Sequence, residues 1–180
     1  MTTHQEPIWY STMDTPIGQL LLVADAQGLR EVWFENGKRQ KTPAPHWIYD
    51  EAKLAFAHIQ LEQYFAGERH VFDLPLHLLG TPFQRDVWHA LAKIPYGTTI
   101  SYGEMARRIG QPKAVRAVGA ANGSNPIPII LPCHRVIGSN GSLTGFGGGL
   151  PTKRFLLSFE DRMARGDLFG GSTESIPAHG

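Results

Sequence analysis

Short runs of apolar residues, separated by turn residues, mark the first part of the chain. The runs cover residues 8–10, 20–24 and 29–34. The segments between them, residues 14–18 and 25–28, contain the Asp, Pro and Gly residues that favour turns. This alternation predicts a small antiparallel meander of short strands.

The spacing of apolar residues then changes to three and four, which is typical of an amphipathic helix. The residues with this spacing lie between positions 49 and 65: Leu54, Ala57, Leu61, Tyr64 and Phe65. We expect a helix here, preceded by a polar connection over residues 35–45 and ended by Gly67. Residues 71–79 are expected to form a short extended piece, and Gly80 marks the boundary between two domains.

Helix start signals are frequent in the second half of the chain. Thr81 is a typical N-cap and Pro82 suits the first helical position, so we expect a helix that includes Ile94 and ends at residues 95–97. Residues 101–104 read Ser-Tyr-Gly-Glu, a capping box that predicts a second helix, running to about residue 109.

A third helix is expected over residues 113–121, opened by Pro112 and ended by an Asn-Gly pair. Together with the preceding helix and the turn at Gly110, it forms a helix-turn-helix signal. Apart from two valines and two cations this helix consists of Gly and Ala, and such small side chains suit the narrow minor groove of DNA. The alternative is close packing against a neighbouring helix, but the position of Arg116 among small residues favours contact with DNA.

The single cysteine, Cys133, follows a proline-interrupted segment over residues 125–132. Proline continues neither a strand nor a helix, so the backbone here is expected to be irregular and rigid. In a regular strand Cys133 and His134 would point to opposite faces, whereas an irregular backbone lets them act together. A thiolate is a strong nucleophile and histidine is a suitable base for it. The alternative is an inert core cysteine.

Beyond the cysteine we expect a turn at residues 138–141 and a mobile glycine-rich loop at 145–149. A final amphipathic helix is expected over residues 150–159, with Lys153 on it and Glu160 at its end. The small polar residues that follow predict a disordered tail over residues 166–180.

Composition narrows the class of protein. The chain has 180 residues, of which 42% are hydrophobic and 18% charged, as in an ordinary globular protein. One cysteine excludes an internal disulfide framework and argues against a cysteine-rich zinc site. The eight histidines show no spacing typical of metal ligands, so we expect no metal and no cofactor. The absence of a signal-like or membrane-spanning apolar run predicts a cytoplasmic protein with no membrane partner.

The two halves of the chain differ in charge. Residues 1–80 carry 6 Lys and Arg against 10 Asp and Glu, whereas residues 81–166 carry 11 against 4. A basic half gains affinity for a polyanion by releasing counterions from its phosphates. The half with the cysteine is therefore expected to face a polyanionic partner, with a solvated basic face as the alternative.

These motifs together resemble the O6-alkylguanine-DNA alkyltransferases, also called methylated-DNA–protein-cysteine methyltransferases. The resemblance rests on Ser-Asn-Pro at residues 124–126 and on Pro-Cys-His-Arg-Val-Ile at residues 132–137. It extends to four further segments: residues 81–84, 101–104, 114–119 and 156–160. Residues 1–78 fit the smaller domain of that family by element order.

The resemblance implies a single-use repair reaction. Cys133 would take the alkyl group from O6 of guanine in an SN2 displacement, after the nucleotide has been flipped out of the duplex. His134 would deprotonate the thiol through a water, with Glu160 orienting the imidazole. Asn125 would brace the turn that holds the cysteine.

The resemblance also implies a set of DNA and base contacts. Tyr102 would donate a hydrogen bond to the flipped base or its phosphate, and Arg116 would replace the extruded base in the stack. Lys153 would order the active-site loop, and Arg135 has either a catalytic role or a structural ion pair. The remaining expected contacts to DNA or the base come from Ala117, Gly119, Val136, Phe146 and Gly147.

The chain departs from the family in the loop. Many relatives have tyrosine where this chain has Phe146, and some have serine where it has Gly147. Without these hydroxyls, the Gly147 backbone N–H would have to serve alone as donor to O6, while the Phe146 ring can still stack on the base. Three consecutive glycines suggest an open pocket wall that would accept benzyl or longer adducts.

The expected fold is an α/β N-terminal domain over residues 1–78, a small antiparallel sheet plus a helix that is ribonuclease-H-like. A mainly α domain with the helix-turn-helix follows over residues 81–165 and would bind DNA and accept the alkyl group. We expect a monomer on double-stranded DNA, with clustering of molecules along DNA as an alternative. Two other functions are weighed: a non-catalytic helix-turn-helix lesion sensor or regulator, and a cysteine hydrolase. Cys133 itself argues against the sensor, and the absence of a protease context argues against the hydrolase.

Overall fold

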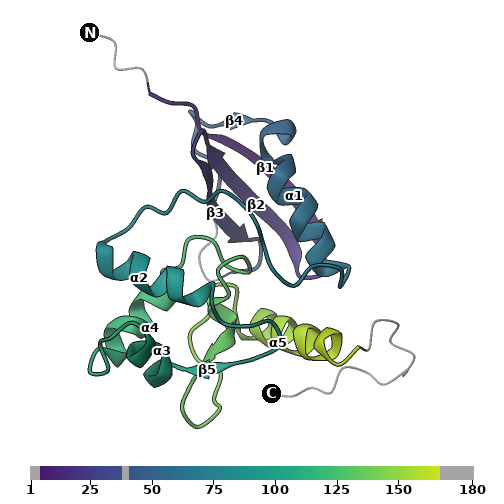
Figure 1. Ribbon diagram of the computed structural model, residues 1–180. Coiled ribbons are helices and arrows are strands. Elements are labelled where there is room, and N and C mark those ends of the chain that lie inside the picture. Colours follow the sequence, from purple (N-terminus) through teal and green to yellow (C-terminus); the bar gives the residue numbers. More distant parts are fainter. Residues whose placement is uncertain (1–4, 38–40, 167–180) are drawn as a thin grey trace. The chain divides into compact units, whose positions relative to one another are not determined.

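The computed structural model describes residues 5–37 and 41–166, and the chain divides into two compact units, Met1–Leu79 and Gly80–Gly180. The disordered tail expected at the C-terminus lies outside the described residues from position 167 onward. The first unit contains one sheet and one helix (Figure 1): β1 (Trp9–Thr15), β2 (Gly18–Asp25), β3 (Gly28–Phe34), β4 (Ile48–Tyr49) and α1 (Glu51–Phe65). The sheet order is β3-β2-β1-β4.

The meander of β1, β2 and β3 is antiparallel, as the sequence predicts. Gly28 has a φ of 145°, and a Cβ at this position would collide with the backbone of Pro75, so the turn requires glycine. The expected extended piece after residue 71 makes a single bridge to β3, at Leu76. The prediction missed β4, which pairs parallel with β1 over two residues, too short a stretch to produce a sequence pattern.

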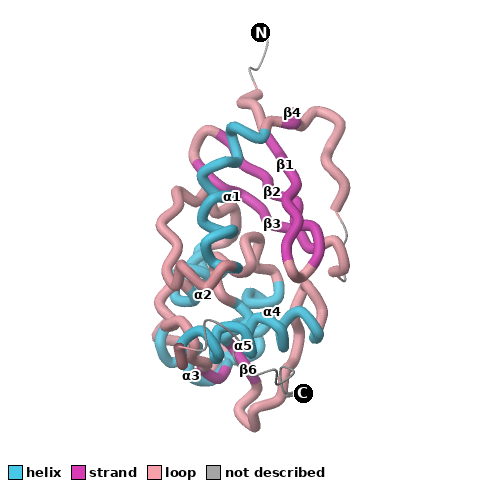
Figure 2. Tube along the Cα trace, turned by 90° about the vertical axis from the view of Figure 1, so that its right-hand side faces the viewer, coloured by secondary structure: helices cyan, strands magenta, loops and turns pink. Residues whose placement is uncertain are grey.

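Helix α1 lies along the sheet and contacts β1 and β2 (Figure 2). Its buried residues are those of the predicted apolar spacing: Leu54, Ala57, Leu61 and Tyr64. The helix starts later than the pattern suggests because Asp50 is the N-cap, with its side chain accepting from Lys53 N at 3.1 Å. Gly67 follows the last turn with a φ of 77°, which explains why the helix ends there.

The second unit is mainly helical. Its elements are α2 (Pro82–Leu91), β5 (Ile100–Ser101), α3 (Tyr102–Arg108), α4 (Val115–Gly123), the 3₁₀ helix η1 (Cys133–Arg135), β6 (Val136–Ile137) and α5 (Leu150–Ala164). Helices α2, α3 and α4 contact one another, and β5 pairs parallel with β6. The fold prediction of a small sheet unit followed by a helical unit is confirmed, and the short β5–β6 pair adds to it.

The capping signals place the helix starts better than the ends. Thr81 and Gln84 form a reciprocal capping box at α2, but this helix ends at Leu91, so Ile94 is buried beyond it. Ser101 caps α3, while the carboxylate of Glu104 binds arginines of its own helix instead of completing a capping box.

The predicted limits of two other helices need correction. Helix α4 starts at Val115, two residues after the predicted start, and Ala114 makes no side-chain cap hydrogen bond there. Helix α5 runs to Ala164, so Glu160 lies within the helix and not at its end. Within the described part of the chain, no helix combines the length and the apolarity needed to cross a membrane.

Candidate active site

The backbone that carries Cys133 is irregular, as predicted, and it is fixed by Asn125. The Asn125 side chain accepts a hydrogen bond from Ile127 N at 2.9 Å and donates one to Leu131 O at 2.7 Å. Between these two anchors Ile129 takes a φ of 74°, a conformation that a β-branched residue rarely adopts. The segment then closes into η1, so Cys133 and His134 stand on one helical turn and not on opposite faces of a strand.

His134, Arg135 and Glu160 form a buried charged cluster that joins η1 to α5. His134 Nε2 lies 2.7 Å from Glu160 Oε2, and the histidine side chain is fully buried. Arg135 donates to both oxygens of the same carboxylate, at 2.7 and 3.0 Å. Burial alone would raise the pKa of Glu160, but the charges and hydrogen bonds of its two partners outweigh burial and hold that pKa well below its usual range.

The cluster sets the tautomer of His134. Because Glu160 is ionised, it accepts a hydrogen bond, so the proton of the neutral ring sits on Nε2 and the lone pair on Nδ1. Burial lowers the pKa of His134, although Glu160 partly opposes this effect. The ring is therefore neutral near pH 7, and among the described residues Nδ1 has no hydrogen-bond partner. This is the state that a general base requires.

The thiol of Cys133 rests in its protonated form. It is 5% exposed, and burial raises its pKa to about 11, although the Asn125 side chain and the charge of Lys153 pull the pKa the other way. A thiol in this state needs a base to become a nucleophile. The neighbouring His134 can supply that base.

Lys153 and Tyr102 hold the start of the glycine-rich loop. Lys153 is fully buried on α5, and its Nζ donates to Val136 O at 2.8 Å and to Thr144 O at 3.1 Å. The Tyr102 hydroxyl, from α3, donates to the same Thr144 carbonyl at 3.3 Å. The resemblance assigns Lys153 to ordering this loop, and these contacts are of the kind that would do so.

Within the loop, the two departures from the family differ in their surroundings. Phe146 is 3% exposed, whereas Gly147 is exposed and a Cβ added there would meet nothing within 4 Å. Val136, at the other side of the Lys153 ammonium, is buried in β6. The open pocket wall that the sequence suggests stays a prediction.

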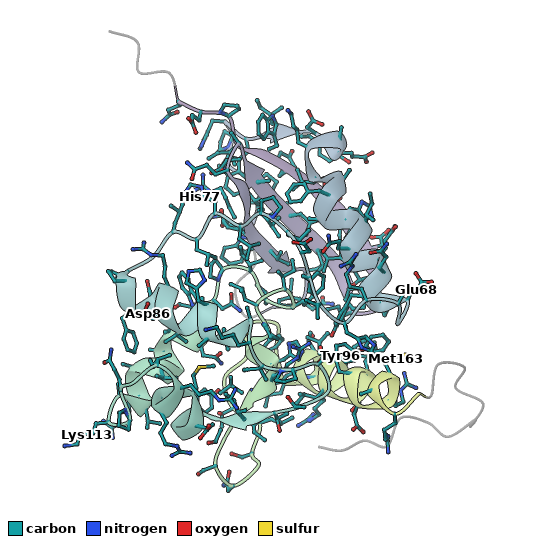
Figure 3. The ribbon with its side chains drawn as sticks, viewed as in Figure 1. Glu68, His77, Asp86, Tyr96, Lys113 and Met163 are labelled. Atoms are coloured by element: carbon teal, nitrogen blue, oxygen red, sulfur yellow. The ribbon has the colours of Figure 1, made fainter. Side chains whose placement is uncertain are left out.

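The residues expected to contact DNA from α4 lie on its outer side. Arg116 and Ala117 are exposed and Gly119 is half-buried, with nothing within 4 Å of an added Cβ. Lys113, just before the helix, projects away from the unit (Figure 3). The buried side of α4, with Val118 and Ala121, faces the interior. Close packing therefore applies to the buried side of α4, and contact of its exposed side with DNA stays a prediction.

Sequence reasoning missed the surroundings of Arg135. Its Nη1 donates to Ile94 O at 2.7 Å, and its guanidinium carbon lies 5.5 Å from the centre of the Tyr96 ring, which Figure 3 labels beside α5. Since Arg135 is 5% exposed and its guanidinium binds Glu160, the geometry favours the structural ion pair over a direct catalytic role or a contact to DNA. The only sequence signal near these partners of Arg135 is Pro-Tyr-Gly at residues 95–97, and that pattern predicts a turn without predicting a contact with Arg135.

A second missed residue is Asn122. It is 3% exposed on α4, and its Nδ2 donates to Cys133 O at 3.4 Å. The sequence shows it only as part of an Asn-Gly helix end. Across residues 5–37 and 41–166, histidine, cysteine and carboxylate side chains form no group of three or more that could hold a metal ion.

A helix-turn-helix unit that carries a buried thiol beside a histidine base held by a carboxylate defines a DNA-binding protein with a cysteine nucleophile. Residues 8–78 match the family model of the 6-O-methylguanine DNA methyltransferase ribonuclease-like domain, and residues 82–162 match that of its DNA binding domain. The chain belongs to the methylated-DNA–protein-cysteine methyltransferase family.

Individual relatives agree with the family models. A methylated-DNA–protein-cysteine methyltransferase of Methanosarcina acetivorans is 52% identical over 85% of this chain and 98% of its own length. One from Haemophilus influenzae is 47% identical over 85% of this chain and 86% of its own. The crystal structure of Mycobacterium tuberculosis OGT in complex with DNA has a TM-score of 0.81 at 50% identity, covering 89% of this chain and 99% of that one.

Proposed function

We propose that this protein repairs DNA by removing alkyl groups from O6 of guanine in the duplex and transferring them irreversibly to Cys133. The observation that carries the proposal is the buried Cys133 next to His134 on η1, with the His134 ring bound to Glu160, in a unit that matches the family's DNA binding domain. Residues 81–165 are the proposed DNA-binding and alkyl-acceptor domain, and residues 1–78 support it.

The transfer is a displacement at the alkyl carbon. The Sγ–C bond forms while the C–O6 bond breaks, and the thiol proton passes through a water to His134 Nδ1. Guanine leaves with the electron pair on O6 and recovers a proton on its base edge. The thioether on Cys133 has no route back to the thiol in this mechanism, so each molecule reacts once.

Donors near O6 lower the barrier because negative charge develops there in the transition state. We assign this role to the Gly147 backbone N–H, which lies in the exposed part of the loop. The Tyr102 hydroxyl is the second donor, once its hydrogen bond to Thr144 O is exchanged for one to the base or its phosphate. Val136 and Phe146 supply the apolar wall against the flipped base.

The alkyl carbon lies inside the duplex, so the nucleotide must leave the stack before it can reach a buried thiol. We assign the place of the extruded base to Arg116, which is exposed near the start of α4. Ala117 and Gly119 allow the helix to approach the groove closely because neither carries a long side chain. The protein is proposed to act in the cytoplasm, where a reducing environment keeps its single thiol free.

Intact mass measurement tests the proposal. After incubation with an oligonucleotide duplex that contains O6-methylguanine, we expect the protein to gain the mass of one methyl group, and Cys133→Ser to gain none. DNA binding without any adduct on the unmodified protein would favour the lesion-sensor alternative. The presence of Cys133 speaks against that alternative.

A further inference from the structure

The turn at residues 95–98 lies against α5 beside the buried charged cluster, and the proposed mechanism gives it no role. The N–H of its last residue donates to the carbonyl of its first at 3.2 Å, and Gly97 takes a φ of 75°, as glycine does at the third position of such a turn. A Cβ at Gly97 would lie 2.7 Å from the Ala164 side chain, so the turn packs closely on α5. This packing fixes the position of Tyr96, the residue before Gly97 (Figure 3).

The ring of Tyr96 contacts the Arg135 guanidinium. The ring centre lies 5.5 Å from the guanidinium carbon, within the range of a cation–π contact. The guanidinium donates its hydrogen bonds to the Glu160 carboxylate and to Ile94 O, so the ring supplies a contact of a different kind. A planar guanidinium that is bonded at its edge and stacked on an aromatic ring is held in one orientation.

The position of Arg135 matters for His134 because both side chains bind the same carboxylate. Burial lowers the pKa of His134, the charge of Glu160 raises it, and the charges of Arg135 and Lys153 lower it. The remaining titratable neighbour, Cys133, is a protonated thiol. If the guanidinium moved off Glu160 or became hydrated, the carboxylate would attract a proton to the imidazole more strongly.

Tyr96 itself stays uncharged near neutral pH. Burial and the charge of Glu160 raise the pKa of its hydroxyl to about 12, although the charge of Arg135 opposes them. We propose that Tyr96 is a positioning residue: its ring holds the Arg135 guanidinium on Glu160, and this contact keeps the His134 imidazole in the neutral state that accepts the thiol proton. The inference rests on the proposed alkyl transfer and adds to it a residue that acts through another side chain.

The test is the pH dependence of alkyl transfer from a duplex that contains O6-methylguanine, measured in single turnover with the protein in excess, from about pH 4.5 to 8. The rate of the unmodified protein should fall as the pH drops through the lowered pKa of His134. In Tyr96→Leu, which lacks the ring, the pKa of His134 should rise, so the fall in rate should begin about half a pH unit higher or more. Tyr96→Phe keeps the ring and should follow the unmodified protein.

Two further variants support the comparison. Tyr96→Met fills the same space with a flexible side chain and no ring, so its pH profile should shift as that of Tyr96→Leu does. Tyr49→Leu is the matched control, because Tyr49 is an exposed tyrosine of the first unit whose hydroxyl donates to Glu51. Its pH profile should coincide with that of the unmodified protein.

A rate lowered by the same factor at every pH in the two ring-less variants would mean that Tyr96 only supports the fold, and it would overturn the inference. An equal shift in Tyr96→Phe would overturn it as well, and so would the failure of both ring-less variants to fold. If the unmodified protein gains no methyl group on Cys133, the proposed function fails and the inference fails with it. Unshifted profiles with a normal adduct on Cys133 contradict the inference alone.

Discussion

The thiol of Cys133 and the imidazole of His134 rest as a neutral pair. Burial keeps both groups uncharged, since it raises the pKa of the thiol to about 11 and lowers the pKa of the ring. A neutral pair avoids a buried ion pair before DNA arrives, when nothing would compensate the desolvation of a thiolate. The proton then moves only when the alkylated base is in place.

The neutral pair predicts a flat pH profile. The reactive thiolate–imidazolium form has a constant population between the pKa of His134, which is depressed below about 6.5, and the pKa of Cys133, about 11. Single-turnover alkyl transfer should therefore be nearly independent of pH from 7 to 9 and should fall only as the pH drops through the lowered pKa of His134. A tenfold rise per pH unit between 7 and 9 would mean that free thiolate reacts without the base.

Glu160 binds both the Arg135 guanidinium and the neutral His134 ring, so its loss should affect both folding and rate. Glu160→Gln leaves Arg135 buried without its counterion, which is expected to lower the free energy of unfolding by about 3–5 kcal/mol. It should also slow alkyl transfer because an amide no longer fixes the Nε2–H tautomer of His134. Urea unfolding and single-turnover rates measure the two effects.

Exposed Asp161, one residue further along α5, offers the control Asp161→Asn, which should change the free energy of unfolding by less than about 1 kcal/mol. A loss of similar size in both variants would contradict this account of the cluster.

At the scale of elements, the sequence predicts what depends on local chemistry. The caps at Thr81 and Ser101 are visible because the same residues that signal a helix start make its hydrogen bonds. Helix ends are harder to predict from the sequence. The apolar spacing continues to Ile94, but α2 ends at Leu91, and Ile94 is buried by tertiary packing outside the helix. Local patterns therefore give the starts of helices better than their lengths.

In the candidate site, too, the sequence predicts some features and misses others. The irregular backbone before Cys133 follows from its prolines, and the partnership of His134 with Glu160 follows from the family motif. The contacts of Asn122 and Arg135 could not be predicted, because each reaches a backbone carbonyl that its sequence position does not specify. Such contacts depend on how η1, α4 and the end of α2 come together in space.

Nucleotide flipping can be tested at Arg116, on helix α4. Because a duplex must be opened and a free base need not be, Arg116→Ala should slow repair in duplex DNA by tenfold or more while leaving attack on free O6-benzylguanine almost unchanged. Arg154→Ala is the matched control, since Arg154 is an exposed arginine on α5 with no proposed contact to the base. Both substrates are followed by the mass of the adduct on Cys133. Equal losses on the two substrates in Arg116→Ala would contradict its place in the stack.

At the scale of the whole molecule, chemistry and charge are concentrated in the same unit. Residues 81–166 carry 11 Lys and Arg against 4 Asp and Glu, and they include the acceptor cysteine and its base. Inside this unit Arg135 and Lys153 are buried and occupied by internal partners. The cations left for phosphates are therefore the exposed ones, among them Lys113 and Arg116.

This distribution predicts how binding to DNA responds to salt. Each phosphate contact releases counterions, so the logarithm of the binding constant should fall linearly with the logarithm of salt concentration. Lys113→Ala should weaken binding to methylated and unmethylated duplexes alike and reduce the slope by about 1, because it removes one phosphate contact without touching the base. Lys53→Ala, in the first unit, is the control: its ammonium lies 4.5 Å from the centre of the Trp9 ring, and the slope should stay unchanged. Fluorescence anisotropy at four salt concentrations measures all three proteins. Equal slopes for Lys113→Ala and the unmodified protein would contradict the prediction, because they would mean that Lys113 contacts no phosphate. A reduced slope in Lys53→Ala would mean that the first unit also contacts DNA.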